Sequence, residues 1–217
     1  MKSPFATVVL AVLLTGCGSR DFERAQRSEI PGETVVVVAD VIYGHKHGMA
    51  LTLDVYQPIE PNGAGVIFIN SGGFTSPVYH FHAQANGHHR LLKDEEVENP
   101  GVRINAVLDR GFTVFNVRHG SSPKFVLPEI DADVRNAVQF VRRVAGRYSV
   151  NPERLALWGE SAGGTLSLLQ ATSSEICQLN SEATSDCVSA PVAAVVAWYS
   201  VSDAKSGNAA ITQYVED

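Results

Sequence analysis

Strand-like patterns recur along the chain from residue 34 onward. Residues 34–39 and 50–56 have the composition of two strands joined by a turn that contains Gly44 and Gly48. The second of these alternates apolar and polar positions, as a half-exposed strand does. Short continuous apolar runs, typical of strands that are buried on both faces, follow at 66–70, 111–117, 155–158 and 192–199.

Helical patterns alternate with these later strands. Apolar residues recur at steps of three and four from Ile130 to Tyr148, which predicts a helix that begins near Pro128. Shorter helices are expected at 103–109 and 162–172. An antiparallel opening pair followed by β-α-β-α-β alternation predicts an α/β fold, in which a mostly parallel sheet has helices on both faces.

The first residues have the pattern of an export signal. A short apolar run at 5–14 follows a basic start and leads into a Leu-Thr-Gly-Cys sequence that ends at Cys17. This sequence resembles the lipobox of bacterial lipoproteins, in which the cysteine is lipidated and becomes the new N-terminus. The resemblance implies a signal peptide at 1–17, a tether at 18–32 and a lipid anchor in the bacterial cell envelope, at the outer membrane facing the periplasm or the exterior. An ordinary secretory signal with an incidental cysteine is the alternative.

Length, charge and cysteine content restrict the number of domains, the binding partners and the disulfides that the chain can have. The chain of 217 residues is long enough for one domain with its own core, which we expect to occupy 33–217. A net charge of −6 gives no electrostatic footprint for nucleic acid. Export permits a disulfide between Cys177 and Cys187, with two free thiols as the alternative. We expect no metal and no cofactor.

The strongest chemical signal is the sequence around Ser161, which runs Gly-Glu-Ser-Ala-Gly-Gly from 159 to 164. A buried strand precedes it and a helix follows it, which is the context of a nucleophile elbow. In such an elbow a tight, strained turn exposes a serine hydroxyl at the carboxyl end of the sheet, where open α/β sheets bind ligands. The helix N-terminus adds a positive partial charge there. A plain Gly/Ser turn is the alternative that this context disfavours.

A second signal follows the strand at 66–70, where the chain reads Asn-Ser-Gly-Gly-Phe. Acyl transfer requires N–H donors aimed at the tetrahedral oxygen, and glycines let the backbone come close to it. The backbone amides of Gly72, Gly73 and Ala162 are therefore the expected oxyanion hole. A simple Gly-Gly turn is the alternative, and the neighbouring elbow favours the catalytic interpretation.

Together these motifs resemble the α/β-hydrolase esterase and lipase families, above all hormone-sensitive-lipase-like carboxylesterases and acetyl-xylan or feruloyl esterases. The likeness covers about residues 33–203 and includes a Leu-Asp-Val-Tyr run from Leu53 and a helix that carries Asp131 or Asp133. It implies an α/β-hydrolase fold, a small-molecule ester as substrate, and Ser161 as the nucleophile of a serine carboxylesterase acting on small acyl or sugar-linked esters.

The chain departs from this family pattern in its histidines. These families usually carry His-Gly-Gly-Gly where this chain has Asn70-Ser71-Gly72-Gly73. Their triad order is Ser, then Asp or Glu, then His, but all histidines here precede Ser161. They are His45, His47, His80, His82, His88, His89 and His119. We therefore expect a C-terminally truncated domain that lacks its last strands together with the catalytic acid and histidine, and we do not assign Asp203 as the acid.

An upstream histidine is the alternative source of a base. His80, His82 and His119 follow strands at the same sheet edge, but the fold fixes where each loop lies, so we expect Arg118 and His119 to line the pocket. The polar segment at 76–100 has the length of a lid or a binding loop.

Two other possibilities remain open. The pairs His45/His47 and His80/His82 would chelate a metal only on a strand and lack a third ligand. The absent triad histidine favours a second function, that of a hydrolase-like surface lipoprotein that binds a ligand or partner without turnover. A serine peptidase of the same fold is disfavoured, because the residues before Thr34 are too few for the extra domain that such enzymes usually carry.

Overall fold

The computed structural model describes residues 34–77, 81–85, 88–93, 96–97, 104–172 and 192–201. The expected signal peptide, lipidation site, tether and disulfide all lie outside these residues, as do His80 and Asp203.

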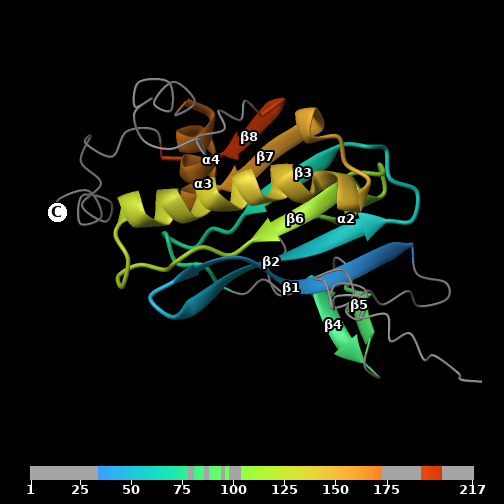
Figure 1. Ribbon diagram of the computed structural model, residues 1–217, viewed down its shortest axis with the longest axis horizontal. Helices are drawn as coiled ribbons and strands as arrows, with labels where there is room; N and C mark the ends of the chain where they lie inside the picture. Colours follow the sequence, from blue (N-terminus) through green and yellow to red (C-terminus); the bar gives the residue numbers. More distant parts are fainter. Residues whose placement is uncertain are drawn as a thin grey trace, which may run out of the picture.

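A six-stranded mixed sheet in the order β1-β2-β6-β3-β7-β8 forms the centre of the molecule (Figure 1). β1 and β2 form an antiparallel hairpin, β2 runs antiparallel to β6, and the strands from β6 to β8 are parallel to one another. The predicted mostly parallel α/β sheet is therefore confirmed. The strands are β1 Val35–Lys46, β2 Met49–Pro58, β3 Gly65–Ile69, β6 Thr113–Val117, β7 Leu155–Glu160 and β8 Ala194–Trp198.

The turn between β1 and β2 is shorter than the sequence suggested. Gly44 pairs with Leu51 inside the hairpin and does not belong to the turn. The chain reverses instead at His47 and Gly48, whose φ values of 47° and 78° are left-handed. A two-residue turn of this kind matches the twist of the strands that it joins.

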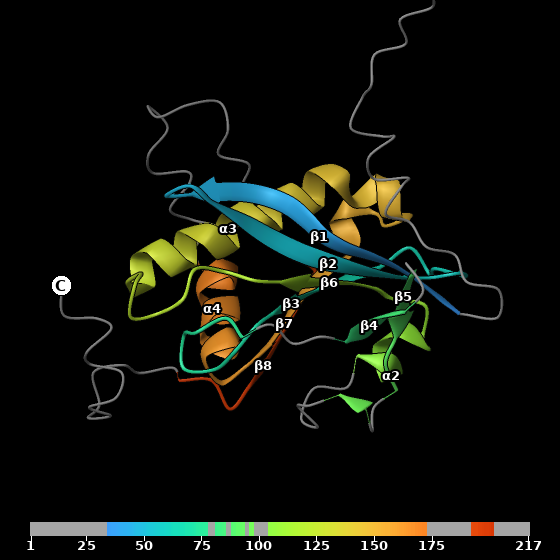
Figure 2. The same ribbon diagram turned by 90° about the horizontal axis from the view of Figure 1, so that it is seen from below.

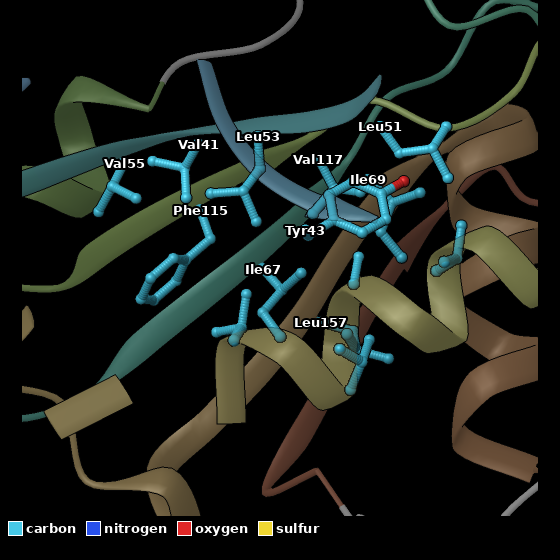
Figure 3. Packing of buried hydrophobic residues seen from close by; sticks show 14 of the residues in the cluster. Val41, Tyr43, Leu51, Leu53, Val55, Ile67, Ile69, Phe115, Val117 and Leu157 are labelled. Carbon is cyan, nitrogen blue, oxygen red and sulfur yellow. The ribbon is translucent and has the colours of Figure 1, made fainter. Parts of the chain in front are cut away.

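Helices cover both faces of the sheet, as predicted (Figure 2). α3 Leu127–Val144 and α4 Ser161–Thr172 pack on one face, and the short α2 Asn105–Leu108 packs on the other. The larger core lies under α3 and α4, where Ile67, Ile69 and Leu157 of the central strands are fully buried (Figure 3). The predicted helix at 130–148 ends as a 3-10 turn, Ala145–Tyr148.

The described residues of the polar segment 76–100 lie against the sheet. It forms a two-stranded hairpin of β4 His82–Ala85 and β5 His88–Leu91. Phe81 packs edge-on against Tyr56 and Phe68, with ring centroids 6.0 Å apart in each pair. The cluster of buried side chains on the α2 face holds the hairpin against that face of the sheet. The sequence left the role of this segment open between a lid and a binding loop, and the described residues place its hairpin on the α2 face, next to Phe81.

Candidate active site

The junction between β7 and α4 has the geometry of a nucleophile elbow. Ser161 is the first residue of α4 and has a φ of 48°, in the left-handed region that non-glycine residues rarely adopt. Backbone strain of this kind persists only where the surrounding structure enforces it. The strained turn that the sequence predicted is thus present, and the role of Ser161 as a nucleophile remains a prediction.

Two glycines allow this turn to be tight. A Cβ at Gly159 would lie 2.2 Å from the carbonyl oxygen of Gly163, so no larger residue fits between the strand and the helix. A Cβ at Gly163 would lie 2.3 Å from the carbonyl oxygen of Ile69, the last residue of β3. The first turn of α4 therefore packs directly on the end of β3, which brings Ser161 beside the loop that follows β3.

That loop contains the predicted oxyanion glycines. Gly72 and Gly73 have φ values of 118° and 63°, which only glycine adopts without strain. Thr75 closes the turn, because its hydroxyl donates to the carbonyl oxygen of Gly72 at 2.6 Å. Phe74 is buried in the larger core and anchors the loop. The structure therefore brings Gly72, Gly73 and Ala162 to one edge of the sheet, as the sequence predicted; their role as oxyanion donors remains a prediction.

A second loop, residues 118–122 after β6, supports the glycine loop. Sequence reasoning did not find this contribution, because serine and asparagine in loops carry no specific spacing signal. Hydrogen bonds join the two loops from both backbone and side chains. They are Asn70 Nδ2 to Val117 O (2.9 Å), Ser122 N to Phe74 O (3.0 Å), Ser76 N to Ser121 Oγ (2.8 Å) and His119 N to Ser76 Oγ (3.1 Å).

The supporting loop is itself held by two buried charge clusters. Asp133 of α3 accepts from Gly120 N at 3.0 Å and pairs with Lys46 of β1 at 3.1 Å. Arg118 donates to both carboxylate oxygens of Asp54, at 2.6 and 2.8 Å. Although burial alone would lower the pKa of Arg118, the hydrogen bond and charge of Asp54 raise it overall, so the guanidinium stays charged. Of the two acids on α3 that the family resemblance pointed to, Asp133 is the one that contacts this site.

His119 does not act on Ser161 in this arrangement. Its imidazole is buried, with Nδ1 2.7 Å from Gly120 O and Nε2 3.2 Å from Asn70 O. Burial lowers the pKa of His119, and the two carbonyl contacts partly oppose this. Among the described residues, no histidine forms a hydrogen bond with the Ser161 hydroxyl. Arg118 and His119 both line a hollow of about 600 Å³ at the β1–β2 side of the loop, but neither Ser161 nor Gly72 and Gly73 line it, so their expected place in the pocket of Ser161 stays a prediction.

Three other described histidines, His82, His47 and His45, also have other positions. His82 Nδ1 lies 2.8 Å from the hydroxyl of Tyr56, on the sheet face away from α4. The ring of His47 stacks on Phe125 at 5.8 Å, and His45 is exposed near the end of β1. Within the ranges that the structure describes, no three His, Cys, Asp or Glu side chains gather in a metal-binding cluster. No described helix is both long and apolar enough to cross a membrane.

Glu160, directly before Ser161, is a further site residue that the sequence analysis did not single out. Its carboxylate is buried and accepts a hydrogen bond from the hydroxyl of Tyr199 at 2.9 Å. One turn along α4, the Thr165 hydroxyl donates to Val201 O and accepts from Val201 N, both at 3.0 Å. These bonds hold the end of β8 against the elbow.

The strand order, the strained serine after β7 and the glycine loop after β3 define the α/β-hydrolase fold. Residues 53–213 match the BD-FAE family, and the chain therefore belongs to this family. No protein with a curated function matches the sequence at a significant level.

Solved structures with this fold include several esterases. A truncated form of a carbohydrate esterase from gut microbiota is 22% identical with a TM-score of 0.56, over 81% of this chain and 58% of that one. Thermogutta terrifontis esterase 2 phosphoramylated by tabun is 17% identical with a TM-score of 0.58, over 88% and 64%. Esterase LipW from Mycobacterium marinum is 22% identical with a TM-score of 0.55, over 80% and 46%. The chain thus spans less than two thirds of the length of each of these proteins.

Proposed function

We propose that this chain carries the nucleophile and the oxyanion hole of a serine carboxylesterase that hydrolyses small acyl or sugar-linked esters. The strained Ser161 beside the glycine loop is the observation that carries this proposal. Membership of the BD-FAE family supports ester hydrolysis. A similar solved structure is described as a carbohydrate esterase, which supports a sugar-linked ester as the substrate class.

The proposed reaction proceeds through an acyl-enzyme. Ser161 Oγ attacks the ester carbonyl carbon as a general base takes its proton, and the carbonyl oxygen becomes an oxyanion. The backbone amides of Gly72, Gly73 and Ala162 would donate hydrogen bonds to that oxyanion. The carbon–oxygen bond to the alcohol then breaks, the alcohol leaves with the proton, and water hydrolyses the acyl-enzyme to release the acid and regenerate Ser161.

In a complete triad a histidine acts as the general base for the serine, and the described part of this chain shows no histidine in that place. Because no described histidine bonds to Ser161, we expect the polypeptide by itself to turn over p-nitrophenyl acetate slowly. A stoichiometric probe is therefore more informative than turnover. A fluorophosphonate phosphonylates the serine of an elbow with loss of fluoride and leaves its phosphoryl oxygen in the oxyanion hole, so its reaction reports both features. Because one attack per molecule is enough, the adduct accumulates over a long incubation even where each attack is slow.

The test compares fluorophosphonate labelling, read by mass spectrometry, in three proteins. The wild type should acquire one adduct on Ser161, and Ser161→Ala should acquire none. Thr172→Ala, which removes a hydroxyl at the exposed end of the same helix, should label like the wild type. Labelling that survives in Ser161→Ala would show that the nucleophile lies elsewhere. Rapid p-nitrophenyl acetate turnover that depends on Ser161 would show that the chain holds a base which we have not identified.

A second candidate function is ligand or partner binding without turnover. The lack of a described histidine at Ser161 favours it. If no fluorophosphonate adduct forms while a hydrolysis-resistant ester analogue still binds, as measured by calorimetry, the binding function replaces the esterase.

We also propose that the protein is anchored in the bacterial cell envelope through a lipid on Cys17, at the outer membrane. The support is the Leu-Thr-Gly-Cys sequence after an apolar run. Expression in a bacterial host with radiolabelled palmitate should give a labelled protein that Cys17→Ser abolishes. A Cys17→Ser protein that retains the label would rule this anchor out.

A further inference from the structure

The imidazole of His119 lies between two carbonyl oxygens that belong to different loops. Nδ1 is 2.7 Å from the oxygen of Gly120, in the supporting loop, and Nε2 is 3.2 Å from the oxygen of Asn70, at the start of the glycine loop. A carbonyl oxygen only accepts hydrogen bonds. Both contacts are therefore hydrogen bonds only when both ring nitrogens carry a proton.

The number of ring protons depends on the charge of the histidine. A neutral imidazole has one N–H and can donate to only one of the two oxygens, whereas an imidazolium has two and can donate to both. The shorter contact, to Gly120, favours the neutral tautomer with the proton on Nδ1. In that form the lone pair of Nε2 faces the lone pairs of Asn70 O, and this contact becomes repulsive.

The N–H and the side-chain Nδ2 of Asn70 both donate to Val117 O, at 3.4 and 2.9 Å, whereas its carbonyl oxygen has only the His119 ring as a hydrogen-bond contact among the described residues. The Gly120 peptide is held by the hydrogen bond from its own N–H to Asp133, which is in turn paired with Lys46. Asn70 already has a buried side-chain oxygen, Oδ1, with no partner among the described residues. Because only Ser71 separates Asn70 from Gly72, a rotation of the 70–71 peptide reorients the start of the glycine loop.

We propose that His119 is a positioning residue for the glycine loop: when protonated it holds the Asn70 carbonyl, and when neutral it releases it. The oxyanion geometry then differs between the two protonation states. The functional meaning of this inference rests on the proposed oxyanion role of Gly72 and Gly73, but its main test does not.

The surroundings of His119 define the direction of the pH dependence. Asp133 from α3 favours the charged ring, and Lys46 from β1 opposes it. Burial is the largest influence and holds the pKa of His119 below the ordinary value of 6.5 for histidine. The change is therefore expected below pH 6.5, on the acid side of the ordinary histidine range.

The experiment is an NMR pH titration of the chain labelled with ¹⁵N at histidine side chains and glycine amides. In the wild type, the amide signals of Gly72 and Gly73 should shift with the same midpoint as the ring nitrogens of His119. In His119→Gln, whose carboxamide can donate to Asn70 O but does not titrate, that shift should disappear. In His45→Gln, which removes an exposed histidine of β1, it should remain.

Three results would overturn the inference: glycine amides that stay fixed while His119 titrates, a glycine shift that persists in His119→Gln, or one that His45→Gln abolishes. The wild-type titration decides the question even if a variant does not fold. A functional readout accompanies it, since the rate of fluorophosphonate labelling should change about threefold to tenfold across the midpoint, less than the loss of a whole oxyanion donor. Failure of labelling at every pH would sink the proposed esterase and leave the NMR result standing.

Discussion

Replacing Gly163 with alanine tests how closely α4 is held against β3. The added Cβ would lie 2.3 Å from Ile69 O and 3.0 Å from Asn70 O, and both obstacles are backbone atoms. Since Cβ atoms essentially never come within 3.0 Å of another heavy atom, α4 must move by at least 3.0 − 2.3 = 0.7 Å. This movement separates Ser161 from the glycine loop.

The effect of this substitution on the free energy of unfolding can be estimated. Overpacking a well-packed interior costs about 1–3 kcal/mol, and backbone obstacles that cannot rotate away place this substitution at the upper end, about 3 kcal/mol. The better helix propensity of alanine offsets about 1 kcal/mol. The free energy of unfolding should therefore fall by about 2 kcal/mol, which corresponds to a decrease in Tm of about 4–8 °C for a domain of this size.

Urea unfolding followed by far-UV circular dichroism measures this difference. The matched control is Gly146→Ala, in the exposed 3-10 turn after α3, where an added Cβ meets nothing within 4 Å. The control should change stability by no more than about 0.5 kcal/mol. If Gly163→Ala proves as stable as Gly146→Ala, the close approach of α4 to β3 is not a constraint and the reasoning fails.

Three further substitutions probe the surroundings of the site. Asp133→Ala leaves the Gly120 N–H without its acceptor and Lys46 with only the carbonyl oxygen of Glu129, and should cost about 3 kcal/mol in urea unfolding. Because burial lowers the pKa of His119, the unfolded chain binds more protons than the native state between that pKa and 6.5. The free energy of unfolding should therefore decrease as pH falls through this window, and less so in His119→Gln. Val196→Lys adds a charge to β8, one of the two edge strands of the described sheet, where this side chain is 51% exposed. It should reduce concentration-dependent association in sedimentation velocity.

Each of these three substitutions has a matched control, which changes either the same part of the molecule or the same type of residue. Glu153→Ala removes an acid that is 72% exposed and pairs with Arg142, on the same helix as Asp133, and should cost no more than about 1 kcal/mol. His45→Gln should keep the pH slope of the wild type. Ile59→Lys charges a side chain that is 56% exposed and lies away from β8, and should leave association unchanged. Equal effects in test and control would contradict the structural explanation in each case.

Local patterns in the sequence identified the parts of the site that depend on neighbouring residues. Ser161 and its flanking glycines were recognisable because an elbow requires small residues within a few positions of the serine, between a strand and a helix. Gly72 and Gly73 were recognisable for the same reason. The alternation of strands and helices was readable because each apolar run is long enough to show its period. The α/β-hydrolase fold followed from these motifs in order.

Contacts between distant segments were not readable in this way. His119 was expected to line a pocket, but the distance of its ring to Asn70 depends on how β6 and β3 pair. The position of the β4–β5 hairpin was not readable, because it depends on one buried aromatic, Phe81, within a polar segment. The contact of Glu160 with Tyr199 similarly depends on the pairing of β7 with β8.

The sequence by itself therefore determined the strand and helix order, the elbow serine and the glycine loop, because these are set by short-range steric rules. Tertiary structure alone decided which atoms support them. The packing of Gly163 on Ile69 sets how close the serine lies to the glycine loop. The His119 ring then contacts the glycine loop, and the Asp133 carboxylate accepts from the supporting loop. These contacts join residues far apart in the chain, and only the folded sheet brings them within hydrogen-bonding distance.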